Sequence, residues 1–232
     1  MNLDTLKQIY LELIKNYDEV AAIKFVRELN SSNENDILEY HHGLLKYQEP
    51  YIDLFYQLRG EFYKHGDEGK AFLLDKINIE TDPDLKAEAL FILGTMECVE
   101  VKPIAISFLK SENYKEQYYG IIVIGWLGKS EDIVILENEL TNNKNSELRA
   151  YAATALRQIA FSNSRLNKKI AGAYSRAYQS EADEIVRKTI IVCFQDLIKV
   201  KFGLRELQTG EITGDLNQAE PKFKKALINY LG

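Results

Sequence analysis

The sequence has little of the residue chemistry that tight turns require. Only 13 of its 232 residues are glycine and 4 are proline, while Leu, Ile, Ala, Lys and Glu are abundant. The abundant residues favour helices, and an all-β fold would need turn residues at short, regular intervals. The composition therefore predicts an all-α protein and argues against a β-sandwich or a β-barrel.

Long apolar runs, secretory features and cysteine pairs are also scarce. The longest apolar stretch covers residues 121–127, whereas a membrane-spanning helix needs about 20 apolar residues. The first residues enter a helical pattern directly, without the basic and apolar regions of a signal peptide. Cys98 and Cys193 lie 95 positions apart and are too few for a disulfide framework. We expect a cytoplasmic protein that does not contact membranes.

Positive charge is scarce in one part of the chain. The formal net charge is -6, and the whole excess falls in residues 1–69, which hold 7 basic and 13 acidic side chains. An acidic surface repels phosphate backbones and speeds association with basic partners. The same carboxylates could serve solubility alone, and both interpretations stay open. The candidate contact residues in this region are Asp18, Glu19, Glu34 and Asp36.

An internal repeat is the most informative feature that the sequence does contain. Five blocks of ten residues superimpose without gaps, and their starts differ by 31, 32, 38 and 37 residues. Positions one, five, eight and nine of each block are mostly apolar or small, which places them on one face of a helix. The blocks are residues 85–94, 116–125, 148–157, 186–195 and 223–232.

Shorter amphipathic segments precede four of these blocks, at residues 70–79, 102–110, 131–140 and 167–177. Each predicts a helix, so the repeating unit is a helix, a turn and a second helix. Such a pair cannot bury its apolar face alone, and neighbouring pairs must stack. Residues 208–217 have no apolar periodicity and are predicted to form a loop.

Four further helices are predicted in the first part of the chain, at residues 5–15, 18–29, 35–47 and 51–63.

The pattern resembles HEAT repeats, in particular the short HEAT-like repeats of bacterial proteins, over about residues 70–232. The resemblance is carried by the apolar-basic start of the blocks, by Ala152-Ala153 and by Leu93-Gly94 and Leu127-Gly128. It implies a curved α-solenoid of stacked antiparallel helical pairs that forms a single domain, residues 1–232. Residues 1–69 would be divergent pairs or a cap.

Three residues depart from the HEAT-like pattern, and the first is Glu116, which starts the second block in place of an apolar residue. Arg157 and Gln195 occupy the tenth position of their blocks, where the repeat usually has a small residue. A larger side chain there changes how two pairs can pack, so we expect these repeats to bend or twist differently.

A basic residue occupies the second position of four blocks: Lys86, Arg149, Arg187 and Lys224. The family pattern uses this position for pairing between repeats, and acidic residues such as Asp84, Glu147 and Asp183 precede it. A ladder of cations could instead grip a nucleic-acid duplex, as in HEAT-like DNA glycosylases. The negative net charge favours ion pairing over phosphate contact.

Residues that commonly carry catalysis or bind metals do not form a recognisable pattern. His41 and His42 are neighbours and point about 100° apart on a helix, so they cannot share a metal ion in the usual i, i+4 way. His65 is expected in a loop. The sequence holds no Gly-x-Ser-x-Gly elbow, no phosphate-binding glycine loop and no cysteine pair with metal-ligand spacing. We expect no enzymatic activity, no metal and no cofactor.

An aromatic stripe is the remaining candidate for a binding surface. The fourth, seventh and eleventh block positions share a face about 120° from the core face. Tyrosine and tryptophan on a rigid surface are typical of protein-binding hot spots. The same face could instead pack against the first helices of the pairs. The residues of this stripe, with a flanking tyrosine, are Phe91, Tyr118, Tyr119, Ile122, Trp126 and Tyr151.

These observations predict a non-enzymatic module that binds another protein. Acidic, single-domain HEAT-like proteins are similar to some immunity proteins that neutralise bacterial toxins, and basic toxin domains suit an acidic inhibitor. The resemblance leaves three alternatives open: a phycobilin-lyase-type protein, a scaffold and a DNA glycosylase. The predicted partner is a basic protein.

Overall fold

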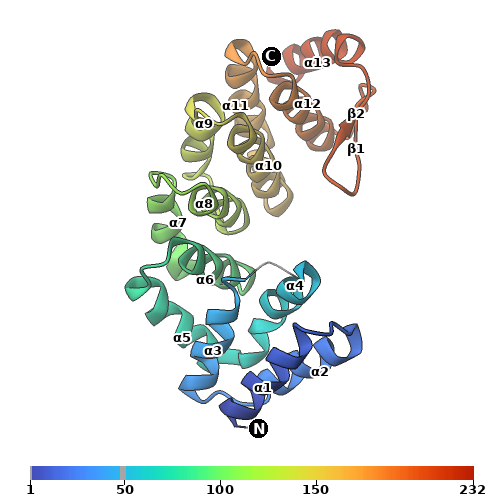
Figure 1. The fold of residues 1–232 in the computed structure, drawn as a ribbon. Coiled ribbons are helices and arrows are strands. Elements are labelled where there is room, and N and C mark those ends of the chain that lie inside the picture. Colours follow the sequence, from blue (N-terminus) through green and yellow to red (C-terminus); the bar gives the residue numbers. More distant parts are fainter. Residues whose placement is uncertain (1, 48–50) are drawn as a thin grey trace. The chain divides into compact units, whose positions relative to one another are not determined.

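The computed structural model describes residues 2–47 and 51–232, and its regular structure is almost wholly helical (Figure 1). The predicted all-α class is confirmed. Internal contacts divide the chain into a first unit, Met1–Val101, and a second unit, Lys102–Gly232, and each is described by itself. In the described part of the chain, no helix combines the length and the apolar character that crossing a membrane requires.

The first unit holds six α-helices and two short 3₁₀ segments in its described residues, and the four helices expected before residue 64 are all present. Helix α1 packs on α2, α2 on α4, and α3 on α4, α5 and α6. Large apolar side chains such as Phe25, Phe55 and Phe62 fill the space between them. The elements are α1 (Leu3–Leu13), α2 (Glu19–Leu29), α3 (Asn35–Leu44), α4 (Ile52–Glu61), η1 (Phe62–His65), α5 (Gly66–Ile79), α6 (Pro83–Thr95) and η2 (Val99–Val101).

The second unit is built from helical pairs followed by a hairpin and a last helix. Helices α8, α10 and α12 contact one another in series, and α9, α11 and α13 form a second series beside them (Figure 1). The elements are α7 (Lys102–Phe108), α8 (Tyr114–Leu127), α9 (Ile133–Asn142), α10 (Ser146–Ser162), η3 (Ser164–Leu166), α11 (Asn167–Ser180), α12 (Glu184–Ile198), β1 (Arg205–Glu206), β2 (Ile212–Thr213) and α13 (Leu216–Leu231).

The second helices begin at short polar residues that satisfy their first N–H groups. Asn113, Asn145 and Asp183 each accept a hydrogen bond from a backbone N–H in the first turn of α8, α10 and α12. Such caps stabilise a helix start by about 1 kcal/mol. Because the three caps precede equivalent blocks, the sequence sets the same start for each helix of the series.

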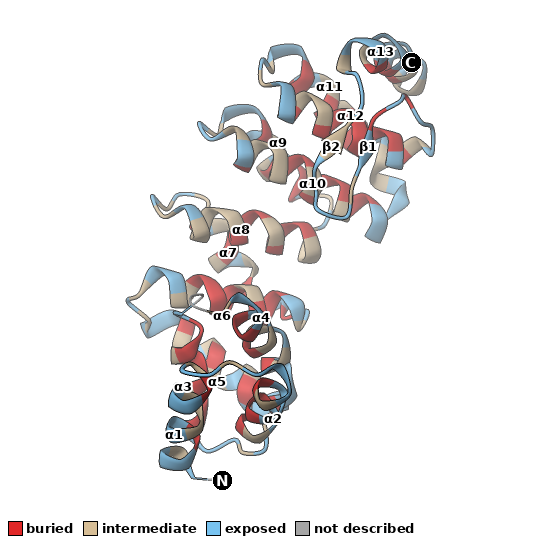
Figure 2. Cartoon of the chain, turned by 45° about the vertical axis from the view of Figure 1, so that its right-hand side comes forward, coloured by how far each residue is buried: buried red, intermediate tan, exposed pale blue. Residues whose placement is uncertain are grey.

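Small residues allow α8 and α10 to approach closely. A Cβ atom added to Gly125 would lie 2.9 Å from the Cα and Cβ atoms of Ala155, so only glycine fits at this crossing. The residues of α8 and α10 around the crossing are buried or partly buried (Figure 2). The core of this unit includes Ile121, Ile124, Leu136, Leu156, Ile190, Phe194 and Phe223.

Two of the basic residues at the second block position, Arg149 and Arg187, form ion pairs between successive helical pairs, whereas Lys224 pairs with Glu220 within α13. Nε and Nη2 of Arg149 donate to the Glu181 carboxylate at 2.7 and 2.9 Å, and Nη2 of Arg187 donates to Glu220 at 2.5 Å. The expected partners Glu147 and Asp183 were wrong for these two arginines. Asp183 instead caps α12, since its carboxylate already accepts from two N–H groups there.

The predicted loop at residues 208–217 is partly wrong. Strands β1 and β2 pair antiparallel with Arg205 opposite Thr213 and Glu206 opposite Ile212, and α13 begins at Leu216. Strands of two residues are too short to produce an alternating hydrophobic pattern, so no strand could be predicted here. The hairpin contacts α12 and exposes most of its residues (Figure 2).

Candidate functional site

The β1–β2 hairpin and the segment before it are held to the second unit by Arg157 and Gln195, two of the three residues that depart from the HEAT-like pattern. Nη1 of Arg157 donates to Asp196 at 2.9 Å and to Glu206 at 2.6 Å. Gln195 donates to the Leu204 carbonyl at 3.1 Å, and its own oxygen accepts from the Phe202 N–H at 2.7 Å. The two departures therefore have a role as anchors of the hairpin. They are the one sequence signal that could have indicated it.

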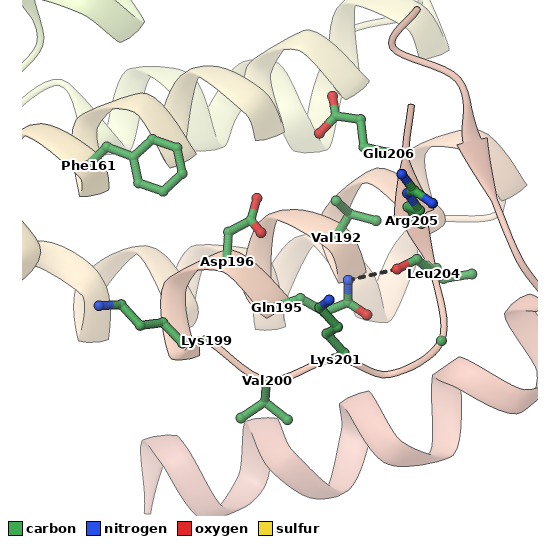
Figure 3. Close-up of a pocket in the computed structure, with 11 residues that line it drawn as sticks. Phe161, Val192, Gln195, Asp196, Lys199, Val200, Lys201, Leu204, Arg205 and Glu206 are labelled. Atoms are coloured by element: carbon green, nitrogen blue, oxygen red, sulfur yellow. Dashed lines mark hydrogen bonds between the residues drawn. The ribbon is translucent and has the colours of Figure 1, made fainter. Parts of the chain in front are cut away.

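A hollow of about 810 Å³ lies on one side of the hairpin, between the ends of α10 and α12 and the segment before β1 (Figure 3). Its carboxylates, Asp196 and Glu206, are paired with Arg157, whereas Lys199, Lys201 and Arg205 are exposed. Figure 3 shows the Gln195 bond to Leu204 at its floor. This mixture of charges defines no single ligand.

A second cavity, here called the hairpin cleft, is also lined by hairpin residues and measures about 650 Å³. Helix α8 contributes Ile122, and the hairpin contributes Glu206 and residues 209–212. Helices α10 and α12 supply the remaining walls. Their lining residues are Ser146, Glu147, Ala150, Tyr151 and Thr154 of α10, and Ile185, Lys188 and Thr189 of α12.

Three tyrosines, Tyr114, Tyr118 and Tyr151, form an aromatic cluster at the rim of the hairpin cleft. The Tyr118 ring centroid is 4.4 Å from that of Tyr151 and 6.2 Å from that of Tyr114. The rings of Tyr114 and Tyr118 are stacked. The Tyr151 hydroxyl donates to Glu147 at 3.4 Å. Burial raises the pKa of Tyr151 to about 12. At neutral pH this phenol is a neutral hydrogen-bond donor and not a base.

Two of the predicted aromatic-stripe residues, Ile122 and Tyr151, line the hairpin cleft, and the flanking Tyr118 packs against Tyr151. Trp126 is half-buried and lies about two turns after Tyr118 on α8. Tyr119 is only 5% exposed, so its ring belongs to the core. Phe91 lies in the first unit, where the Arg59 guanidinium carbon is 4.3 Å from the centre of its ring.

The four acidic candidates of the first unit are exposed at the starts of two helices. Asp18 caps α2 by accepting from the Ala21 N–H at 2.7 Å, and Glu19 is in the first turn of the same helix. Glu34 precedes α3, and Asp36 lies in its first turn. The two pairs thus belong to the starts of two different helices.

The histidines are buried, and His65 lies in a 3₁₀ turn, not in the expected loop. Nδ1 of His41 is 2.8 Å from Nε2 of His65, and its Nε2 is 3.0 Å from the Leu58 carbonyl. Burial lowers the pKa of His41 to about 3 and that of His65 to about 4. Both rings are therefore neutral at pH 7 and act as structural hydrogen-bonding groups.

Nucleophilic and metal-binding chemistry finds no support in the residues that the structure describes. Burial raises the pKa of the Cys193 thiol to about 11 and also raises the pKa of Cys98, so both sulfurs stay protonated at neutral pH. Within residues 2–47 and 51–232, no three His, Cys, Asp or Glu side chains are grouped so that they could hold a metal ion.

Comparison with known proteins assigns this chain to no family. The sequence matches none of the protein-family models, and a search of curated proteins finds no match. Function must therefore be inferred from the residues themselves.

Proposed function

We propose that the chain is a non-enzymatic protein-binding module, and most concretely an inhibitor of the immunity type that holds a basic toxin domain. The observation that carries this proposal is the tyrosine cluster beside the hairpin cleft. Tyrosines offer a large apolar area with a polar tip and lose little conformational entropy on binding, which is why they dominate protein-binding hot spots. A cleft next to such rings gives a partner side chain a place to be buried.

A HEAT-like solenoid is part of the same proposal. Pairs linked by Arg149–Glu181 and Arg187–Glu220 repeat a contact at intervals of 32 and 33 residues, close to the spacing of the sequence blocks. Helices α8, α10 and α12 would then line one face, as the second helices of repeats do in such stacks. The tyrosine cluster lies on this series of helices.

The state of the basic residues favours a protein partner over nucleic acid. A phosphate-binding ladder would have Arg149 and Arg187 at its centre. These arginines already form ion pairs with Glu181 and Glu220, so a phosphate would have to displace a carboxylate from each of them. The net charge of -6 adds repulsion.

Affinity capture with a matched pair of variants tests the proposal. Wild-type protein, Tyr118→Ala/Tyr151→Ala and a control, Tyr47→Ala/Tyr63→Ala, are immobilised and exposed to lysate of the source organism. The control removes two tyrosines that are 56% and 54% exposed in the first unit. We expect one basic protein to be retained by the wild type and the control and to be reduced at least tenfold by the cluster variant. Losses of 2 kcal/mol or more are usual at such hot spots.

The captured protein is then assayed for its own activity with increasing amounts of the purified chain. Stoichiometric inhibition supports the inhibitor function. Equal retention by the wild type and the cluster variant, or a partner whose activity is unchanged when bound, would show the proposal to be wrong.

A further inference from the structure

We infer that the hairpin cleft is a binding site for an arginine or lysine side chain of an extended segment of the partner. This inference rests on the proposed function and names the part of the partner that the chain recognises. Three properties of the cleft lead to it: its charge, the apolar character of its walls and its size.

Carboxylates dominate the charge of the hairpin cleft. Glu147, Glu206 and Glu211 line it, and the one cation among its lining residues is Lys188. Lys188 Nζ lies 2.7 Å from the Glu184 carboxylate and is thus already neutralised. Glu206 is shared with Arg157. Glu147 and Glu211, both exposed, remain to attract a cation from a partner.

The walls suit the carbon stem of a long basic side chain. Ile122, Ile185 and Ile212 contribute apolar surface, and Ile185 is 66% exposed although it lies in a cavity. The Tyr151 ring stands beside Glu147. Arginine and lysine bury their methylenes on such surfaces, and a guanidinium also stacks on aromatic faces. An acidic or a purely apolar ligand would use only part of this lining.

The helix start that borders the cleft does not provide an anion site. Ser146 begins α10, and helix N-termini attract anions through free N–H groups. Here the Asn145 side chain already accepts from the Glu147 N–H at 2.8 Å, and the Glu147 carboxylate occupies the same end. The volume of about 650 Å³ falls within the range of ligand pockets, about 300–1,000 Å³, and exceeds what one side chain fills. A short peptide segment therefore fits better than a free amino acid.

Peptide titration of the isotope-labelled full chain tests the inference. The probes are three blocked pentapeptides of glycine and serine whose central residue is arginine, its neutral isostere citrulline, or glutamate. Amide signals of residues such as Ile122, Tyr151 and Thr189 are followed by NMR. We expect the arginine peptide to shift these signals and the citrulline peptide to bind about tenfold more weakly, because it lacks the charge-assisted contacts.

A charge-matched pair of variants makes the assignment specific. Glu147→Gln/Glu211→Gln is expected to weaken the arginine peptide about tenfold, whereas Glu12→Gln/Glu131→Gln, which removes the same charge elsewhere on exposed positions, leaves binding unchanged. Preserved dispersion of the remaining signals shows that each variant is folded.

Several results would overturn the inference: no shifts at the cleft, equal binding of the arginine and citrulline peptides, or preference for glutamate. None of them would alter the outcome of affinity capture, so the proposed function could stand without this site. Conversely, peptide binding at the cleft without a captured and inhibited partner would contradict the proposed function alone.

Discussion

At the scale of single residues, the hydrogen-bond partners of His41 determine which of its ring nitrogens carries a hydrogen. The Leu58 carbonyl can only accept, so Nε2 of His41 carries the hydrogen and Nδ1 of His41 must accept from His65. Protonating His41 would place a hydrogen where it now accepts one. Asn33 Oδ1 lies 2.9 Å from His65 Nδ1, and Asn33 Nδ2 donates to Glu68 at 3.5 Å. Burial lowers the pKa of both rings and thereby favours their neutral forms.

This preference predicts that the protein loses stability in mild acid. Unfolded histidine has a pKa near 6.5, and the folded values are lowered to about 3 for His41 and about 4 for His65. Between about pH 4 and 6.5 the unfolded chain binds more protons, so stability is full above this window and falls as pH drops through it. The loss approaches about 1.4 kcal/mol per pH unit for each ring.

Urea unfolding of the wild type and of His65→Gln at pH 7, 6 and 5 measures this loss. The variant removes one titrating ring and should flatten the pH dependence, even if its stability at pH 7 is lower. A wild-type free energy of unfolding that stays constant from pH 7 to pH 5 would contradict the prediction.

A second residue-scale prediction concerns the glycine that closes the hairpin. Gly214 has a φ of +111°, and a Cβ atom added to it would lie 2.4 Å from the Gly203 carbonyl oxygen. Both the backbone conformation and the contact with a neighbouring backbone exclude a side chain. Gly214→Ala is therefore expected to lower the free energy of unfolding by more than about 1 kcal/mol.

Gly43→Ala provides the matched control for this substitution. Gly43 lies inside α3, and an added Cβ atom meets nothing within 4 Å. Alanine there should stabilise the protein by about 0.5–1 kcal/mol. Both values come from denaturant unfolding curves, and a Gly214→Ala variant as stable as the wild type would show that the hairpin end tolerates rearrangement.

At the scale of elements, the hairpin depends on one buried guanidinium. Arg157 is 8% exposed and joins α10 to Asp196 of α12 and Glu206 of β1. Arg157→Met should release the hairpin at a cost of roughly 1–3 kcal/mol, because the remaining carboxylates are partly exposed and can be hydrated. Faster amide exchange is expected at Leu207 and Gly210, whose N–H groups bond within the hairpin.

Arg176→Met is the control, because it removes an ion pair with Glu137 on an arginine whose side chain is 62% exposed. Amide exchange at Leu207 and Gly210 should stay at the wild-type rate in this variant. Equal exchange in Arg157→Met and Arg176→Met would mean that Arg157 does not hold the hairpin.

The helices could be predicted from the sequence because period and caps act locally. Asn145 and Asp183 mark the starts of α10 and α12 as their residue types indicate. The unusual Arg157 and Gln195 were a signal of something at this position, but they could not specify strands two residues long that lie 48 or more positions after Arg157.

The candidate site was predicted only in part for a geometric reason. Tyr118 and Tyr119 differ by about 100° around α8, and only the neighbouring helices decide which ring is covered. Tyr118 meets Tyr151 across the contact between α8 and α10, and Tyr119 is buried. Five of the fourteen residues that line the hairpin cleft come from the hairpin, which no repeat pattern includes.

At the scale of the whole molecule, the uneven charge acts through a field and not through single contacts. Asp18 and Glu19 lie at the start of α2, and Glu34 and Asp36 lie at the start of α3. Exposed carboxylates at these two helix starts add to the potential that a basic partner meets on approach. Their expected contribution is to the association rate.

Removing this field should slow association with the captured basic partner. The variant is Asp18→Asn/Glu19→Lys/Glu34→Lys/Asp36→Lys, in which asparagine keeps the cap of α2. We expect a lower association rate, a flatter dependence of that rate on salt and a nearly unchanged dissociation rate.

Surface plasmon resonance at several salt concentrations measures both rates. A second variant changes the net charge by the same amount at exposed glutamates of the second unit, including Glu112 and Glu131. Comparing the two variants shows whether the position of the removed charge or only the net charge affects the association rate. If the two variants slow association equally, net charge alone steers the partner. If the first variant leaves association unchanged while the hairpin-cleft variants weaken binding, the acidic N-terminal third serves solubility, because recognition then depends on the second unit without help from the first.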